Sequence, residues 1–191
     1  MFVGKCFNVS KEFEEFCVER DLINEARPAV ERLRANGLSV VTAESCTAGL
    51  IAAVLTHIPG AGDCFQGAFV AYSKKQKVTA LGLDETLLRE KGSVNPETAE
   101  QMGLGALTNS PATLALAVTG VLGPDPDEDG NPAGLVYIAI CREHVAATVK
   151  KFNFQGSPHS VRRQAVREAL FMLGAAAADT GSTGRVPLIR P

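Results

Sequence analysis

A serine stands where an apolar run gives way to a helix-forming run, in the segment Glu44-Ser45-Cys46-Thr47-Ala48-Gly49. The preceding residues 38–43 are rich in β-branched types and predict a strand, while residues 50–55 predict a helix with an apolar face. Ser45 then lies near a helix N-terminus, where unpaired N–H groups and the helix dipole favour a phosphate, a carboxylate or a developing oxyanion. Two interpretations follow: Ser45 is a nucleophile at an anion site, or it only caps the helix.

The cysteines offer one alternative nucleophile. The chain has five, an odd number, and no C-x-x-C pair, which argues against a disulfide framework and a thiolate zinc site. Most are expected to be small buried side chains. Cys46 differs because a helix N-terminus lowers the pKa of a thiol, so it could replace Ser45 as the nucleophile. The cysteines are Cys6, Cys17, Cys46, Cys64 and Cys141.

A serine nucleophile needs a base, and none of the three histidines suits the task. His57 lies on the same predicted helix as Ser45, about 18 Å along its axis. His144 falls in a predicted hairpin turn near the other end of a strand. His159 opens the last predicted helix without an evident acidic partner, which favours a solvated surface position.

Lysine and tyrosine are the remaining candidate bases, and residues 72–77 supply both. Tyr72 ends the second predicted strand and Lys77 lies about one turn into the following helix, so both can face one sheet edge. A lysine kept neutral by burial can take a proton from serine. The alternative is a solvated basic helix face that also carries Lys74 and Lys75, because lysines are mostly exposed.

A long loop follows the strand that ends near Thr119. Its glycines in Thr119-Gly120-Val121-Leu122-Gly123-Pro124 let backbone amides approach a ligand. The next residues, Asp125 to Gly130, imitate the start of a calcium loop, but the twelfth position is Val136 and two prolines interrupt it. We therefore interpret them as a solvated acidic loop and expect no metal.

The order of predicted elements defines the fold class. Helices alternate with strands, and a hairpin follows near the end, which predicts an α/β domain: a three-layer α/β/α sandwich with a mixed, mostly parallel sheet. In such folds ligands bind at the carboxyl ends of strands, and the turns after Glu44 and after Thr119 are both strand ends. The predicted helices span about 21–36, 50–58, 74–81, 84–91, 95–107 and 157–178, and the strands about 38–43, 65–73, 112–119, 135–141 and 145–154.

Composition excludes several classes of function. The 191 residues carry a net charge of −2 without a long basic stripe, so no nucleic-acid partner is expected. No stretch has the roughly 18 apolar residues of a membrane span, and we expect a cytoplasmic protein with no membrane contact. We divide the chain into an N-terminal helical extension (1–24), one domain (25–178) and a mobile tail (179–191).

From about Arg27 to Leu173 the chain resembles the CinA C-terminal domain family, the nicotinamide-nucleotide amidohydrolases. Four segments carry the resemblance in order and spacing. They are TAESCTAGLIAAVLTHIPGAG at 42–62, FQGAFVAYSKKQK at 65–77, LGL with KGSV within 81–94, and AVTGVLGPD followed by NPAGLVYIAI within 117–140.

The resemblance implies hydrolysis of the carboxamide of nicotinamide mononucleotide, a pyridine nucleotide, to nicotinate mononucleotide and ammonia, in NAD salvage. It implies Ser45 as nucleophile, Lys77 and Tyr72 as the proton-handling pair, no metal, no organic cofactor and a homodimer. Helix-end amides after Ser45 would stabilise the oxyanion, and the Thr119-Gly120 turn with Arg162 would hold the ribose phosphate. The implied substrate-binding residues are Glu44, Cys46, Thr47, Gly49, Gly67, Thr119, Gly120 and Arg162.

Some positions depart from the family pattern. Ala48 stands where a second glycine is usual, Asn95 where serine is usual, and Pro158 where an arginine is usual. The loss of that arginine removes a candidate phosphate ligand. These departures leave an alternative from another class: a catalytically weak or inactive homologue that serves as a nucleotide-binding or assembly module.

Overall fold

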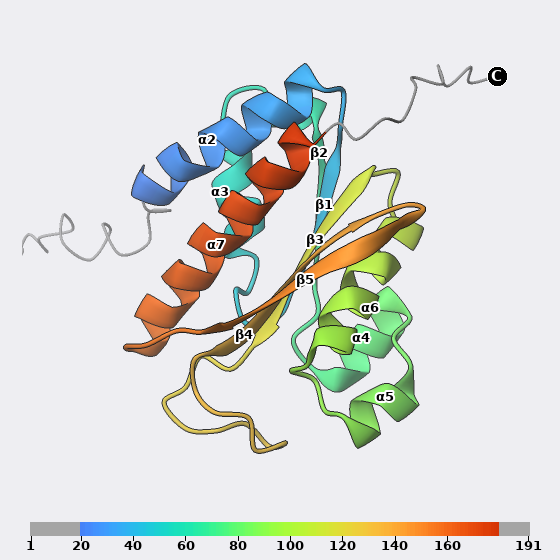
Figure 1. Ribbon diagram of the computed structural model, residues 1–191, viewed down its shortest axis with the longest axis vertical. Coiled ribbons are helices and arrows are strands. Elements are labelled where there is room, and N and C mark those ends of the chain that lie inside the picture. Colours follow the sequence, from blue (N-terminus) through green and yellow to red (C-terminus); the bar gives the residue numbers. More distant parts are fainter. Residues whose placement is uncertain (1–19, 180–191) are drawn as a thin grey trace, which may run out of the picture.

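A five-stranded sheet forms the centre of the computed structural model, which describes residues 20–179 (Figure 1). The strand order is β2-β1-β3-β4-β5. β1 pairs in parallel with β2 and β3, whereas β4 is antiparallel to both β3 and β5. Only β4 therefore runs against the other strands. The strands are β1 (Val40–Glu44), β2 (Phe65–Val70), β3 (Leu114–Gly120), β4 (Leu135–Arg142) and β5 (Val145–Asn153).

Helices cover both faces of the sheet (Figure 1). One face carries α2 (Arg20–Ala35), α3 (Leu50–Thr56) and α7 (Pro158–Ala178), and the other carries α4 (Lys74–Leu81), α5 (Glu85–Glu90) and α6 (Pro96–Thr108). A short 3₁₀ helix spans Ala61–Asp63. The predicted three-layer sandwich with a mixed sheet is confirmed.

Burial along the strands follows from these layers. Every residue of β1 is buried, and so are all but the last residue of β3, because helices cover both of their faces. β5 lies at an edge and alternates between exposed and partly buried residues over much of its length. Two apolar clusters result, one on each side of the sheet.

Side chains at predicted cap positions begin four of the helices. Ser73 accepts a hydrogen bond from Gln76 N at the start of α4, and Asn95 accepts one from Thr98 N at the start of α6. Asp84 and Ser157 do the same for α5 and α7. These bonds satisfy N–H groups that have no acceptor within the helix.

The predicted terminal segments fall largely outside the described residues, since 1–19 and 180–191 are not part of them. The predicted boundary at residue 24 lies inside α2, and Leu22 on that helix is fully buried in the core. Between residues 20 and 179, no helix combines the length and apolar character needed to cross a bilayer.

Three strand ends meet at one edge of the sheet. Ser45 N, just after β1, donates to Val118 O on β3, and Ala71 N, just after β2, donates to Glu44 O. The serine segment, the segment before α4 and the end of β3 are thereby held side by side, although up to about 75 residues separate them in sequence.

Candidate active site

Ser45 and Lys77 lie in direct contact at this sheet edge. The distance between Ser45 Oγ and Lys77 Nζ is 2.9 Å. Because Ser73 caps α4, Lys77 falls one turn into the helix, where it is 1% exposed and reaches the serine hydroxyl. Ser45 is 6% exposed, so the hydroxyl can be approached from only a narrow range of directions.

Two backbone carbonyls fix the orientation of the lysine amine. Lys77 Nζ donates to Ala71 O at 3.0 Å and to Tyr72 O at 3.3 Å. An ammonium group has three N–H donors, which these carbonyls and Ser45 Oγ satisfy. A neutral amine has only two, and when both are bound to the carbonyls its lone pair faces the serine hydroxyl. The neutral lysine is thus oriented to accept the serine proton.

Burial favours this neutral form. It lowers the pKa of Lys77 to about 8. A negative charge on Cys46 would oppose that effect, but burial also raises the pKa of the Cys46 thiol to about 12. The thiol is therefore neutral near pH 7, which argues against Cys46 as the nucleophile.

Of the two interpretations of Ser45, the one in which it only caps the helix is wrong. Helix α3 begins at Leu50 with Gly49 as its N-cap, so four residues separate Ser45 from the helix. The helix-end amides are occupied by the carboxylate of Glu44, which accepts hydrogen bonds from Gly49 N, Ile51 N and Ala52 N at 2.9–3.2 Å. These amides are not available to an oxyanion, contrary to our expectation.

A cavity of about 780 Å³ opens beside Ser45, a volume in the range of small-molecule sites. Its walls come from the residues after β1, the start of α4, the turn before α6, the loop after β3 and the start of α7. The lining residues are Ser45, Cys46, Tyr72, Ser73, Lys74, Lys75, Ser93, Val94, Gly120, Val121, Leu122, Gly123, Asp125, Asp127, Glu128, Pro158 and Arg162. Lys77 lies beneath this wall and meets the cavity through Ser45.

Arg162 supplies a cation at the wall of the cavity. Its Nε donates to Cys46 O at 3.3 Å, which ties α7 to the segment that follows Ser45. Within the described residues, no hydrogen bond or ion pair engages its two terminal nitrogens. Arg162 can therefore bind an anionic group in the cavity.

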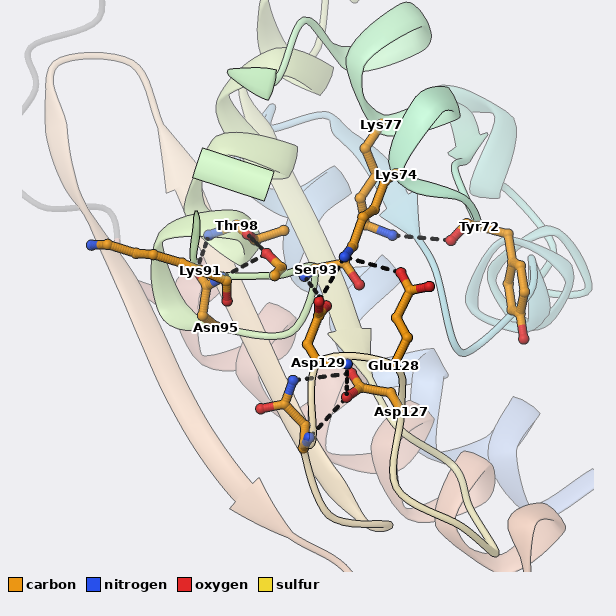
Figure 2. A network of polar contacts seen from close by, with 12 residues as sticks. Tyr72, Lys74, Lys77, Lys91, Ser93, Asn95, Thr98, Asp127, Glu128 and Asp129 are labelled. Atoms are coloured by element: carbon orange, nitrogen blue, oxygen red, sulfur yellow. Dashed lines mark hydrogen bonds and ion pairs between the residues drawn. The ribbon is translucent and has the colours of Figure 1, made fainter. Parts of the chain in front are cut away.

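The acidic loop, residues 125–130, is largely exposed, as expected, but contacts also tie it to two other segments of the site. Asp129 accepts hydrogen bonds from Lys74 Nζ at 2.7 Å and Ser93 N at 3.1 Å, while Glu128 forms an ion pair with Lys74 at 3.0 Å (Figure 2). The side-chain contact with Asp129 is the main reason that the pKa of Lys74 is raised. The loop is thereby fixed as a wall of the cavity.

Tyr72 lines the cavity, but its side chain is 76% exposed. Figure 2 shows the ring turned away from Lys77, whose amine meets the Tyr72 carbonyl oxygen instead. The proximity of Tyr72 and Lys77 thus comes from the backbone rather than from the phenol. The segment that the sequence singled out, residues 72–77, does reach the cavity wall through residues 72–75.

The structure distributes the expected substrate-binding residues unevenly. Cys46, Gly120 and Arg162 line the cavity. Glu44 is fully buried and does not line the cavity, Gly67 lies within β2, and Gly49 is the N-cap of α3. The other two are buried and lie outside the cavity lining: the hydroxyl of Thr119 donates to Ser93 O, and that of Thr47 has no partner among the described residues.

Several residues at the site carried no signal in the sequence. Ala71 contributes a backbone carbonyl, and no side-chain pattern identifies such a group. Ser93 and Val94 reach the cavity from the turn before α6. Their KGSV segment contributed to the family resemblance, but no chemical role was derived for it.

The fold and the site together define an α/β domain with a serine–lysine pair at the carboxyl edge of its sheet. Comparison with protein families identifies the lineage: the model of the CinA C-terminal domain matches residues 24–177. The chain belongs to the CinA C-terminal domain family.

Curated relatives include proteins of different lengths. The nicotinamide-nucleotide amidohydrolase PncC of Escherichia coli K12 is 34% identical over 152 residues, which cover 80% of this chain and 92% of that protein. A competence-damage-inducible-type protein of Caldicellulosiruptor bescii is 38% identical over 156 residues, 82% of this chain. The match covers only 37% of the length of that relative.

Solved structures agree with the fold. The competence damage-inducible protein A of Klebsiella pneumoniae superposes with a TM-score of 0.80 at 30% identity, covering 84% of this chain and 99% of that one. The competence/damage inducible protein CihA of Agrobacterium tumefaciens gives a TM-score of 0.78 at 37% identity, covering 82% and 96%.

Proposed function

We propose that this protein hydrolyses the carboxamide of nicotinamide mononucleotide, giving nicotinate mononucleotide and ammonia, as a step of NAD salvage. The observation that carries the proposal is the 2.9 Å contact between Ser45 Oγ and a buried Lys77 whose pKa is lowered to about 8. The similarity to PncC, which is named as a nicotinamide-nucleotide amidohydrolase, supports the choice of substrate.

In the first half-reaction, neutral Lys77 accepts the proton of Ser45 Oγ as that oxygen attacks the carboxamide carbon. An amide is a poor electrophile, so the hydroxyl must lose its proton during attack. The resulting ammonium of Lys77 then protonates the departing nitrogen. The carbon–nitrogen bond breaks, ammonia leaves, and an ester joins the nicotinate group to Ser45.

In the second half-reaction, Lys77 accepts a proton from a water molecule that attacks the ester. The bond to Ser45 Oγ breaks, the oxygen recovers a proton from Lys77, and the carboxylic acid product loses its remaining proton to solvent and leaves as the carboxylate. In this scheme Arg162 binds the phosphate of the nucleotide. Tyr72 contacts the bound substrate from the cavity wall and acts on protons only if its phenol turns inward. A cytoplasmic homodimer is part of the same proposal.

Ammonia release from nicotinamide mononucleotide tests the proposal. We expect the Ser45→Ala and Lys77→Met variants to lose at least about 1,000-fold in kcat, because each lacks a group that every step uses. Arg162→Met should instead raise KM by about tenfold with less effect on kcat, because it removes one charged contact to the phosphate. Equal turnover by wild type and Ser45→Ala would refute the mechanism.

The alternative is a binding or assembly module that has lost efficient turnover. Two departures from the family pattern suggest it: Ala48 replaces a usual glycine, and Pro158, which lines the cavity, replaces a usual arginine. Calorimetry with nicotinamide mononucleotide distinguishes the two: tight binding by wild type without product, together with unchanged affinity in Lys77→Met, would favour the module.

A further inference from the structure

A carboxylate that the proposed chemistry does not use lies directly beside the nucleophile. Glu44 ends β1, is fully buried and does not line the cavity. Its oxygens accept three hydrogen bonds from the start of α3 and a fourth from Thr42 Oγ1 at 3.2 Å. The carboxylate oxygens of Glu44 are therefore not available to accept hydrogen bonds from a substrate in the cavity.

These bonds do what a capping side chain normally does. The first N–H groups of a helix have no acceptor within the helix, and a side chain at the N-cap usually supplies one. The N-cap of α3 is Gly49, which has no side chain. Glu44 supplies the acceptors from five residues upstream and so joins the end of β1 to the start of α3.

Residues 45–48, which we call the serine turn, span the gap between these two fixed ends. On the strand side, Ser45 N donates to Val118 O and Glu44 O accepts from Ala71 N. On the helix side, the carboxylate of Glu44 holds Gly49. The position of the serine hydroxyl therefore depends in part on how firmly both ends are held.

The conformation of the serine turn makes this support necessary. Ala48 has φ of 54° and the adjoining Gly49 has φ of 89°, both in the left-handed region. That region is unfavourable for a residue with a side chain, such as Ala48. The only hydrogen bond between backbone groups inside the turn joins Ala48 N to Ser45 O at 3.1 Å. Two contacts from outside the turn also hold it, from Leu50 N to Thr47 O at 3.1 Å and from Arg162 Nε to Cys46 O at 3.3 Å, so the carboxylate shares this support with them.

We propose that Glu44 is a positioning residue of this active site: its buried carboxylate fixes the serine turn and so keeps Ser45 Oγ within bonding distance of Lys77 Nζ. The inference rests on the proposed hydrolysis for its kinetic consequences. It replaces the substrate-binding role that the family resemblance implied for Glu44.

The Glu44→Gln variant tests the role, because the amide group keeps the size of the side chain but replaces one acceptor oxygen with a donor. We expect kcat for ammonia release to fall on the order of 100-fold, with KM within about threefold of wild type, because a displacement near 1 Å costs that much. The matched control is Glu97→Gln, which changes an exposed carboxylate in the first turn of α6 and should leave both constants unchanged.

Two kinetic outcomes would overturn the proposal. A substrate-binding role for Glu44 predicts a raised KM with unchanged kcat. A purely structural role predicts less folded protein but an unchanged kcat for each folded molecule, with the folded fraction measured by circular dichroism. Should Glu44→Gln fail to fold, Glu44→Asp, which is one methylene shorter, gives the same comparison.

Measurements without substrate separate this proposal from the proposed function. In a crystal structure of Glu44→Gln, the distance between Ser45 Oγ and Lys77 Nζ should exceed 3.5 Å, and a distance kept at 2.9 Å would overturn the inference. In the wild-type protein, amide hydrogen exchange at Gly49, Ile51 and Ala52 should be slow, although first-turn amides usually exchange fast. Fast exchange there would also overturn it. Failure of wild type to release ammonia would refute only the proposed function.

Discussion

The rate of hydrolysis should rise with pH as Lys77 loses its proton. Burial lowers the pKa of Lys77 to about 8, so the neutral base that accepts the serine proton predominates only above that pH. With that pKa, about 1% of the lysine is neutral at pH 6, about 10% at pH 7 and about half at pH 8. The value of kcat should therefore increase about 50-fold from pH 6 to pH 8 and less than about twofold from pH 9 to pH 10.

The assay is ammonia release at saturating nicotinamide mononucleotide, buffered from pH 6 to pH 10. Saturation matters because the substrate phosphate itself titrates near pH 6, and kcat reports only groups in the enzyme–substrate complex. Lys151→Met is the matched control, since Lys151 is an exposed lysine on β5 that does not line the cavity, and its profile should equal that of wild type.

Two results would refute the reasoning. A rate that keeps rising tenfold per unit to pH 10 would show that Lys77 titrates near its ordinary pKa and that burial does not prepare the base. A rate independent of pH from 6 to 9 would show that no base with a pKa in this range limits the reaction.

Three further changes have defined outcomes. Lys77→Met should raise the free energy of unfolding at pH 7 by up to about 3 kcal/mol, less the cost of leaving the carbonyls of Ala71 and Tyr72 without their donor, because burial lowers the pKa of Lys77 from its ordinary value to about 8. Between about pH 8 and pH 10.5, the unfolded wild type binds more protons than the folded wild type, so the stability of the wild type rises with pH in this range. The stability advantage of the variant should therefore disappear, which urea titrations at pH 7 and pH 10.5 would measure. Asp129→Asn should raise KM about threefold, because the acidic loop is then held less firmly as a wall of the cavity. It should lower the free energy of unfolding by at most about 1 kcal/mol, because the contact of Asp129 with Lys74 is partly exposed. Added salt should reduce this difference between wild type and variant in urea titrations. Ala48→Gly should raise the free energy of unfolding by up to about 1 kcal/mol, because glycine adopts φ near 54° without strain, with thermal unfolding as the readout.

Local signals predicted most of the fold. Helix α4 spans the residues predicted for it, because Ser73 caps its start and the chain turns at Gly82, which is left-handed. The start of α6 was found from Asn95 and the proline after it. Alternation of helices and strands then sufficed for the layers, because parallel strands need helical crossovers.

The start of α3 shows where local signals fail. A serine before a helix-forming run is typical of an N-cap, but here the cap is Gly49 and the acceptors come from Glu44. A sequence pattern assigns a role to each residue from its type and does not reveal that the carboxylate of Glu44 accepts a hydrogen bond from a backbone amide five residues later. A polar residue at a strand end was therefore assigned to substrate rather than to the backbone.

Sequence patterns also could not predict the long-range ion pair of the acidic loop. Its partner Lys74 precedes Asp129 by 55 residues, and each side chain alone looks like a solvated charge. The pairing of Ser45 with Lys77 was inferable because both were expected at one sheet edge. The exposure of the Tyr72 ring could not be inferred, since the turn after β2 determines whether the ring or the carbonyl group of Tyr72 faces inward.

The two main-chain oxygens that hold the Lys77 amine have a consequence for how this site can change over time. Because Ala71 and Tyr72 contribute carbonyl groups, exchanging either side chain leaves those acceptors in place. Substitutions of the side chains that line the cavity therefore leave the contacts that orient the Lys77 amine unchanged. Successive substitutions in the walls could adapt the cavity to other carboxamides while the reacting pair stays intact, which makes this scaffold a favourable starting point for redesigning amide selectivity.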